Sequence, residues 1–377
     1  MSAVTHSRED FDVAIVGAGF AGLACARSVA MRGMRALVIE RSSAEKRVIR
    51  TTGLLVKEAA ERWEVPARLT RRVRGVRIYA PGMRYVDLQA PGYYFLATDT
   101  AALMEWLTHE AQRAGATVRY NQRFEGARRR DGWIELDGGA PRARYLVGAD
   151  GPNSAVARAF GLGRNQAFLA GVETEYRGVG GVDPDRLHCF VDSRLARGYI
   201  AWVVPGVDGI TQVGLAARRP DRLDLRAFEQ KIRGLFDFTA ARPIARRGGL
   251  IPIGGRVKPF ATERVLLTGD AAGLVSPLTA GGIHTALESG WCAAHAIVDF
   301  LQDQGHDPAR ITAKAYPRFV CKRGLRWLAD LPPPNWLYDA LLGTAPARRV
   351  ASAIYFHRRS ASMTDEQEDG YSRSADP

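Results

Sequence analysis

The first apolar segments of the chain alternate between the pattern of a buried strand and that of a helix. Residues 11–16 are apolar apart from Asp12 and include β-branched members, residues 20–32 are alanine-rich, and residues 35–39 are again apolar after Arg35. Short apolar runs of about four to eight residues are typical of strands in a parallel sheet, whereas the longer alanine-rich segment favours a helix. The pattern therefore predicts a βαβ unit at the start of the chain.

Further along, the pattern leaves this unit and returns to it. Residues 73–95 alternate in polarity and hold many turn residues, whereas residues 100–115 have a helical period. Short antiparallel strands are predicted over 117–147, and strand patterns dominate again over 171–217. An apolar helix is predicted over 283–301. The first unit is therefore expected to be discontinuous in sequence.

Two short helices are predicted near the end of the chain. The first follows Pro332 with Asn335 as its N-cap, and Pro346 begins the second. Residues 360–377 are polar, and we expect them to form a disordered tail.

Three glycines follow the first predicted strand in the pattern G-x-G-x-x-G. Gly17 can take a positive φ, Gly19 has no Cβ to collide with a ligand, and Gly22 lets helix and strand approach. Glu40 ends the next strand, where a carboxylate accepts hydrogen bonds from a ribose diol. Because an acid disfavours a 2′-phosphate, this arrangement predicts bound FAD or NAD, with the pyrophosphate at a helix N-terminus.

A second glycine-rich segment decides between the two dinucleotides. Gly269 and Asp270 follow the short apolar strand 265–268, which places a carboxylate beside a polyol such as the ribityl chain of a flavin. Gly281 and Gly282 lead into a helix at Ile283, whose first N–H groups can face the flavin edge that gains negative charge on reduction. We therefore expect FAD.

With these segments in place, the chain resembles a known group of flavoenzymes. The glycine segments, together with Gly148-Ala149-Asp150-Gly151, are similar to those of the para-hydroxybenzoate hydroxylase superfamily, and the geranylgeranyl reductase branch matches best. That branch carries Y-x-W-x-F-P followed by G-x-G. Here Tyr199, Trp202 and Pro205 precede Gly214, with one extra residue between the aromatics, Val204 in place of Phe and Ala216 in place of the last Gly.

The resemblance implies the residues of the site. The expected cofactor-binding residues are Gly17, Gly19, Phe20, Ala21, Gly22, Glu40, Arg41, Arg50, Asp150, Gly269, Asp270, Gly281, Gly282 and Ile283. Candidate catalytic residues are Tyr199, Trp202 and Thr52. Thr52 lies in the segment where some reductases of the branch carry a cysteine, so a thiol proton donor is not expected there. No metal site is expected.

The expected fold is α/β, with a discontinuous Rossmann-like FAD-binding domain, a second β-sheet-based substrate domain and a C-terminal helical segment. The FAD-binding domain is assigned to 1–75, 97–165 and 249–300, and the substrate domain to 76–96 and 166–248. The C-terminal helices are assigned to 301–359 and the tail to 360–377.

Charge and cysteine content add expectations about partners. The 53 Lys and Arg against 40 Asp and Glu give a net charge of +13, which favours an anionic partner unless the surface is simply basic. No basic run is interleaved with aromatic residues as in nucleic-acid motifs, which leaves a membrane surface or a phosphorylated ligand as the anionic partner. A prenyl substrate, as the resemblance implies, together with the basic surface favours peripheral association with an anionic membrane. The four cysteines form no close pair and the N-terminus has no apolar leader. We expect a cytoplasmic protein with peripheral association on the inner face of the membrane.

The predicted function is an FAD-dependent oxidoreductase that reduces carbon–carbon double bonds of a prenyl or similarly apolar substrate. No second G-x-G-x-x-G follows a strand. NAD(P)H is therefore expected to dock transiently, or a ferredoxin-like protein to supply the electrons. The alternatives are a flavin-dependent aromatic monooxygenase and a non-catalytic flavin electron carrier.

Overall fold

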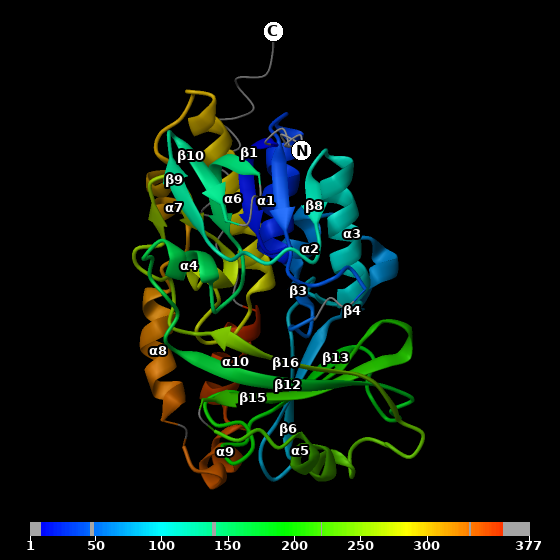
Figure 1. The fold of residues 1–377 in the computed structure, drawn as a ribbon. Coiled ribbons are helices and arrows are strands. Elements are labelled where there is room, and N and C mark those ends of the chain that lie inside the picture. Colours follow the sequence, from blue (N-terminus) through cyan, green and yellow to red (C-terminus); the bar gives the residue numbers. More distant parts are fainter. Residues whose placement is uncertain (1–8, 46–48, 138–140, 220, 332, 357–377) are drawn as a thin grey trace.

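Two large β-sheets form the body of the protein, one above the other in Figure 1. The computed structural model describes residues 9–45, 49–137, 141–219, 221–331 and 333–356. The first sheet has β8, β2, β1, β11 and β18 as parallel neighbours, with β17 antiparallel beside β18. The strands of this sheet are β1 (Asp10–Val16), β2 (Ala36–Ile39), β8 (Thr117–Arg119), β9 (Ala127–Arg130), β10 (Trp133–Leu136), β11 (Arg142–Gly148), β17 (Ala261–Thr262) and β18 (Val265–Leu267).

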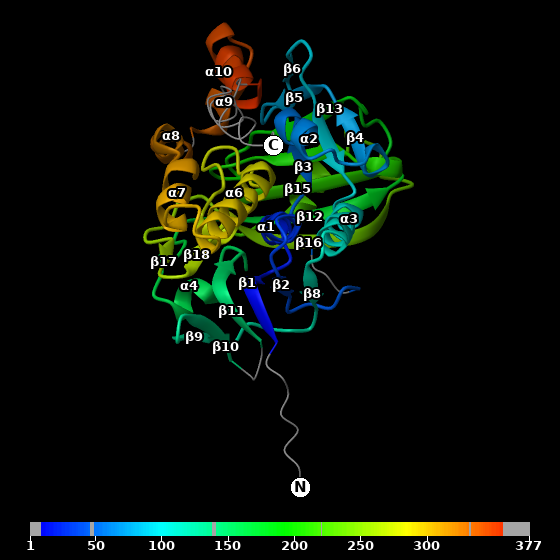
Figure 2. The same ribbon diagram turned by 90° about the horizontal axis from the view of Figure 1, so that it is seen from above.

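Three helices lie side by side against this sheet (Figure 2). They are α1 (Phe20–Met31), α3 (Thr100–Arg113) and α6 (Ile283–Leu301). Strands β1 and β2 are fully apolar at their centres and buried, as the βαβ prediction requires. The expected helix over 283–301 is confirmed. The fold is thus the predicted α/β arrangement, with a parallel sheet at its centre.

The second sheet is mostly antiparallel and lies below the first in Figure 1. Its order is β16 (Arg242–Pro252), β12 (Phe168–Arg177), β15 (Ile210–Arg218), β14 (Ala201–Pro205), β13 (Arg186–Phe190), β5 (Gly75–Tyr79) and β6 (Tyr85–Gln89). Helix α5 (Leu225–Ile232) covers the face turned away from the first sheet. The pairing of β16 with β12 extends this sheet to Pro252. The domain boundaries drawn from the sequence stay predictions.

Short elements connect the two sheets. The chain crosses through a three-stranded sheet of β3 (Leu54–Val56), β7 (Phe95–Thr98) and β4 (Thr70–Val73). Further short elements are the helices α2 (Lys57–Arg62) and α4 (Ala155–Ala159) and the 3-10 turns η1 (Ala67–Leu69), η2 (Val207–Gly209) and η3 (Gly269–Ala272).

The C-terminal helices are α7 (Pro308–Ala315), α8 (Val320–Asp330), α9 (Asn335–Leu341) and α10 (Ala345–Phe356). Helices α7, α8 and α9 run from the first sheet down the side of the second, and α10 lies behind the second sheet (Figures 1 and 2). Buried Arg326 on α8 donates hydrogen bonds to the carbonyls of Gly198 and Pro277, which lie on different parts of the chain. This arginine fixes α8 against both. The expected tail over 360–377 lies outside the described residues.

The predicted cap of α9 is wrong. Asn335 is the first helical residue, and its side chain makes no cap hydrogen bond. Instead its Oδ1 accepts from the N–H of Ser193 at 2.9 Å, and its Nδ2 donates to Asp192 at 2.8 Å. The Asn335 side chain therefore makes tertiary hydrogen bonds to the segment after β13 instead of capping the helix, as the local sequence predicted.

Candidate active site

The expected cofactor residues meet at one edge of the parallel sheet. Gly17 follows β1, Glu40 follows β2, Asp150 follows β11 and Gly269 follows β18. These four strands are adjacent and parallel, so their carboxyl ends face the same way. A crevice outside the carboxyl ends of such strands is the usual place for a nucleotide in this type of fold.

The glycine turn after β1 leaves a cradle at the start of α1. Gly17 has φ of +101°, and a Cβ there would lie 2.5 Å from the carbonyl oxygen of Ala149. A Cβ at Gly22 would lie 1.9 Å from the Gly17 oxygen, whereas a Cβ at Gly19 would meet no atom within 4 Å. Gly17 and Gly22 are thus required by the protein itself, and Gly19 borders space suited to a pyrophosphate. Phe20 and Ala21 form the first turn of α1 beside it.

Glu40 binds the backbone of this turn directly. One carboxylate oxygen accepts the N–H of Ala18 at 3.0 Å, and the other accepts the N–H of Ser42 at 3.0 Å. Each oxygen has a further lone pair, and Glu40 lines the main cavity of the protein, as does the exposed Arg41. The carboxylate is held where it can accept from a ribose hydroxyl.

The two glycine-rich segments, far apart in sequence, contact each other. A Cβ at Gly269 would lie 2.8 Å from the Cβ of Ala21, and a Cβ at Gly290 on α6 would lie 2.1 Å from the Ala21 oxygen. Ser289 on α6 accepts hydrogen bonds from the Thr268 hydroxyl and the Gly269 N–H at 2.9 and 3.1 Å. Helices α1 and α6 therefore approach closely enough to place both segments at one site.

Two half-buried carboxyls at the site, Asp150 and Asp270, have room for hydrogen-bond donors. Asp150 Oδ2 accepts from the N–H groups of Ala155 and Val156, but its buried Oδ1 has no partner among the described residues. Burial raises the pKa of Asp150, and it raises the pKa of Asp270 to about 6. Hydroxyl groups of a bound ligand would satisfy both carboxyls, which fits the ribityl and ribose groups of FAD.

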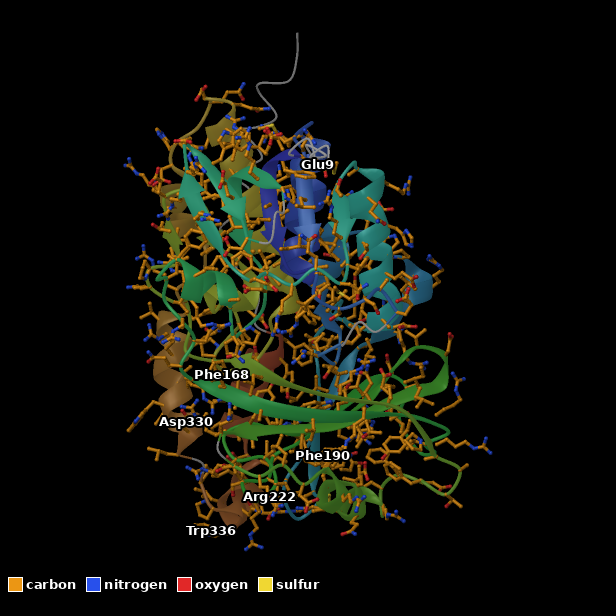
Figure 3. The ribbon with its side chains drawn as sticks, viewed as in Figure 1. Glu9, Phe168, Phe190, Arg222, Asp330 and Trp336 are labelled. Atoms are coloured by element: carbon orange, nitrogen blue, oxygen red, sulfur yellow. The ribbon has the colours of Figure 1, made fainter. Side chains whose placement is uncertain are left out.

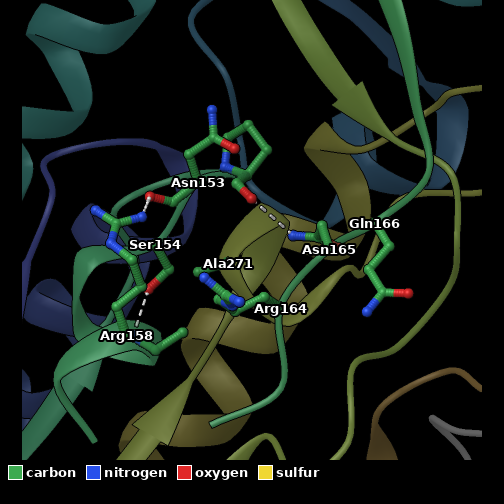
Figure 4. Close-up of a pocket in the computed structure, with 9 residues that line it drawn as sticks. Asn153, Ser154, Arg158, Arg164, Asn165, Gln166 and Ala271 are labelled. Carbon is green, nitrogen blue, oxygen red and sulfur yellow. Dashed lines mark hydrogen bonds between the residues drawn. The ribbon is translucent and has the colours of Figure 1, made fainter. Parts of the chain in front are cut away.

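Asn165 joins the two acidic loops and was not found from the sequence. Its Nδ2 donates to the carbonyl of Pro152 at 3.0 Å and to the carbonyl of Asp270 at 2.8 Å. Figure 4 shows Asn165 in a small pocket lined mostly by polar residues, with its bond to the Pro152 carbonyl as a dashed line. One side chain thus holds the loops after β11 and β18 together, and no local sequence pattern marks it.

The start of α6 is fixed by a residue of the second sheet region. Gly282 is the N-cap without a side-chain cap, so the first N–H groups of α6, from Ile283 on, are not taken by a capping side chain. The hydroxyl of Tyr199 donates to the Thr279 carbonyl at 2.6 Å, just before Gly281. Burial raises the pKa of Tyr199. Tyr199, expected as a catalytic residue, therefore holds the segment that leads to α6.

One cavity of about 2390 Å³ connects these residues to the second sheet. An ordinary ligand pocket has roughly 300–1,000 Å³, so this cavity has room for a dinucleotide and a second molecule. The cavity is lined by Arg50 and by every expected cofactor residue discussed above except Gly22 and Gly269. Its far part lies between strands β13 and β14 and helices α9 and α10, with apolar lining that includes Leu187, Ile200, Val204, Leu342 and Ile354.

A buried polar cluster lies on the face of the second sheet that borders this cavity. Glu173 on β12 is only 4% exposed, and its Oε2 accepts from the Thr52 hydroxyl at 2.7 Å and from Trp202 Nε1 at 2.8 Å. A Cβ at Gly214 would lie 2.6 Å from the Trp202 ring. Gly214 therefore lets the indole lie across β15 to reach Glu173. The sequence singled out Thr52 and Trp202, but it missed the carboxyl that joins them.

Helices of the described residues offer no span long and apolar enough to cross a bilayer.

Comparison with known proteins agrees with this architecture. Residues 10–315 match the model of an FAD binding domain family. A digeranylgeranylglycerophospholipid reductase of Methanopyrus kandleri is 30% identical over 322 residues, which is 78% of each chain. Another, from Methanosphaera stadtmanae, is 27% identical over 78% of this chain and 79% of its own.

Among solved structures, a geranylgeranyl bacteriochlorophyll reductase-like protein of Thermoplasma acidophilum has the same fold. Its TM-score is 0.79 at 22% identity, over 96% of this chain and 99% of that one. Together with the glycine cradle, the paired acidic loops and the relatives above, this shows that the chain is an FAD-dependent oxidoreductase of the geranylgeranyl reductase branch.

Proposed function

We propose that the protein reduces carbon–carbon double bonds of a prenyl or similarly apolar substrate. One observation carries the proposal: the same cavity has a dinucleotide cradle at one end and an apolar lining at the other. Relatives that share 78% of their length with this chain are named as reductases of a lipid with geranylgeranyl chains. An apolar chain gains about 0.8 kcal/mol for each methylene it buries, so the far part of the cavity favours such a substrate.

The residues that would hold FAD follow from the geometry of the cradle. Gly17, Gly19 and Gly22, with Phe20 and Ala21, would hold the pyrophosphate at α1, while Glu40 and Arg41 would face the ribose. Asp150, Gly269 and Asp270 would bind the polyol, and Gly281, Gly282, Ile283 and Arg50 would lie near the flavin ring. When bound and reduced, FAD supplies a hydride equivalent to the alkene.

The protein's own task in this reaction is to enclose and position the alkene. Trp202 and Thr52 line the cavity, and both donate hydrogen bonds to Glu173 on the second sheet. Tyr199 fixes the segment before α6 and so the shape of this region. A correctly held alkene reacts when its carbon is about 3–3.5 Å from the hydride donor, which requires a rigid lining. NAD(P)H, docking transiently, or a ferredoxin-like protein is the proposed electron donor.

Peripheral binding to an anionic membrane is part of the proposal. Of the twelve large hydrophobic side chains that are exposed among the described residues, nine belong to the stretch 320–354 of α8 to α10. Trp336, which is 68% exposed, lies at the outer end of these helices in Figure 3. Exposed Arg323, Arg348 and Arg349 stand among them. Apolar side chains with basic neighbours suit an anionic bilayer surface, from which a lipid could enter the cavity.

Vesicle sedimentation tests this surface. We expect the protein to bind phosphatidylglycerol vesicles and to bind phosphatidylcholine vesicles much less. Trp336→Ala should weaken binding roughly 10-fold because one large buried side chain is lost from the bilayer. The control is Met31→Ala, a large apolar residue that is 64% exposed at the end of α1. Equal loss in both variants would contradict the assignment of the surface to α8–α10.

Anaerobic turnover tests the reaction. The purified holoenzyme, reduced with dithionite, is mixed with digeranylgeranylglycerophospholipid or geranylgeranyl diphosphate, and products are analysed by mass spectrometry. The proposal predicts flavin reoxidation without oxygen and products heavier by two hydrogens for each bond reduced. A product that forms only with oxygen and carries a hydroxyl would identify a monooxygenase, and no turnover would favour an electron carrier.

A further inference from the structure

Reduction of an alkene needs a proton as well as a hydride, and the cavity lining on the second sheet includes a buried carboxyl, Glu173, that can supply it. Glu173 and Glu175 both lie on β12, are 4% and 9% exposed, and share Arg247 as their cation. Arg247 bonds directly to Glu175, whereas its distance to Glu173 Oε1 is 3.8 Å. Two carboxyls and one guanidinium leave a surplus negative charge, which a buried site avoids by keeping one proton.

The geometry places that proton on Glu173. Its Oε1 accepts no hydrogen bond within the described residues, while Glu175 has both Arg247 and Gln212 as donors. Burial raises the pKa of Glu173, and the nearby Glu175 charge raises it further, against the opposing effects of Thr52, Trp202 and Arg247. The less neutralised of the two carboxyls is therefore the one that retains the proton.

Thr52 connects this carboxyl to the cavity. Its hydroxyl lies 2.7 Å from Glu173 Oε2, and Thr52 is one of the residues that line the cavity. The backbone around it is pinned, because Gln212 donates to the Thr52 carbonyl at 2.9 Å and Arg247 donates to the Thr51 carbonyl at 3.1 Å. When Glu173 is protonated on Oε2, it can donate to the Thr52 oxygen, which frees the hydroxyl hydrogen to point into the cavity.

We propose that Glu173 stores the proton for the reduction and that the Thr52 hydroxyl delivers it to the alkene. This inference rests on the proposed function. The π bond breaks, the hydride equivalent of the reduced cofactor forms one C–H bond, and the Thr52 proton forms the other. Thr52 takes the proton of Glu173, and the resulting carboxylate is reprotonated by water. Thr52 is the catalytic group that touches substrate, and Glu173 acts through it as a positioning residue and proton store.

The first experiment follows anaerobic reoxidation of the reduced holoenzyme by geranylgeranyl diphosphate. Because general acid catalysis contributes about 10²–10⁴-fold, Thr52→Val and Glu173→Gln should slow reoxidation by that order. Thr52→Ser, which keeps the hydroxyl, should stay within about 10-fold of the wild type. Glu229→Gln, on α5 beyond the opposite face of the sheet, is the matched control and should react at the wild-type rate.

The dependence on pH distinguishes proton supply from a structural role. In the wild type, reoxidation should slow as pH rises through the raised pKa of Glu173, because the proton store is then lost. In Glu173→Gln the slow rate should not change over that range. If the wild type is reoxidised and Thr52→Val is reoxidised at the same rate, the proton relay is overturned but the proposed function is not. Failure of the wild type itself to be reoxidised would contradict the proposed function, and the relay with it.

A second readout needs no turnover. Near neutral pH, the infrared spectrum of the wild-type protein should contain the C=O stretch of a protonated, buried carboxyl, and Glu173→Gln should lack that band. Glu229→Gln should retain it. A band that persists unchanged in Glu173→Gln would overturn the assignment of the proton to Glu173, whatever the activity of the variant.

Discussion

The two ends of the cavity are built in different ways. The cofactor end consists mainly of backbone: glycines with required conformations, loops after parallel strands and the starts of two helices. The other end consists of side chains from the second sheet and from α8–α10, brought together across long sequence distances. A cofactor common to a large family needs a constant backbone cradle, whereas a substrate site can be changed by side chains alone.

This difference predicts that space at the cofactor end can be filled without disturbing the protein. Gly19→Val adds atoms where the protein has none within 4 Å, yet in the path expected for a pyrophosphate. We expect FAD affinity to fall by about 1,000-fold, which is about 4 kcal/mol, with an unchanged Tm of the apoprotein. FAD titration of the apoprotein measures this. Gly234→Val, at a position equally open, should leave FAD affinity intact.

The buried acid of the same end predicts a dependence of stability on pH. The pKa of Asp270 is raised to about 6, so its stabilising contribution is full below about pH 4 and is lost as pH rises through about 6. At about 1.4 kcal/mol for each pKa unit, the free energy of unfolding would fall by nearly 3 kcal/mol. Because water in the cavity screens the charge, we expect a fall of about 2 kcal/mol.

Denaturant unfolding of the cofactor-free protein checks this. Between about pH 4 and pH 7 the free energy of unfolding should fall for the wild type relative to Asp270→Asn. Added FAD should reduce the difference, because ligand hydroxyls then donate to the ionised carboxylate. Parallel curves for the two proteins would show that Asp270 is not the buried acid described above.

At the substrate end, a single methyl group should disturb the polar cluster. A Cβ at Gly214 would lie 2.6 Å from the Trp202 ring, so Gly214→Ala should displace the indole from Glu173 and destabilise the protein by about 1–3 kcal/mol. Unfolding and tryptophan fluorescence measure both effects. Gly171→Ala on the adjacent strand β12 meets only ordinary contacts of 3.6 Å or more, and a similar loss there would contradict this account.

The smallest expected effect lies where the two ends join. Tyr199→Phe removes the hydrogen bond to the Thr279 carbonyl, which should cost about 1 kcal/mol and loosen the segment before α6. Hydrogen exchange over 277–283 should increase, and FAD should bind only slightly more weakly. Unchanged exchange in this segment would show that Tyr199 does not hold it.

The residues that the sequence assigned to the cofactor end lie together in the structure because their signals are local. Gly17 and Glu40 lie within one βαβ unit, and the spacing of such residues follows from the geometry of a strand, a turn and a helix. The position of Gly269 beside Ala21 needed the resemblance, because no local pattern reports which distant helices pack together.

The substrate end was only partly predictable. The sequence singled out Trp202 and Thr52 as candidates but passed over their partner Glu173, because a glutamate in an alternating strand normally faces solvent. Asn165 and Arg326 were missed for a different reason. Each forms hydrogen bonds to backbone groups that are remote in sequence. Such contacts depend on how the two sheets are placed, which periodicity does not determine.

The most direct test of the account is a crystal structure of the protein with FAD and digeranylgeranylglycerophospholipid. The account predicts the dinucleotide across the carboxyl ends of β1, β2 and β11, and a prenyl chain in the same cavity between β14 and α10. A prenyl chain bound elsewhere, or FAD bound away from Gly19, would contradict the claim that one cavity brings cofactor and substrate together.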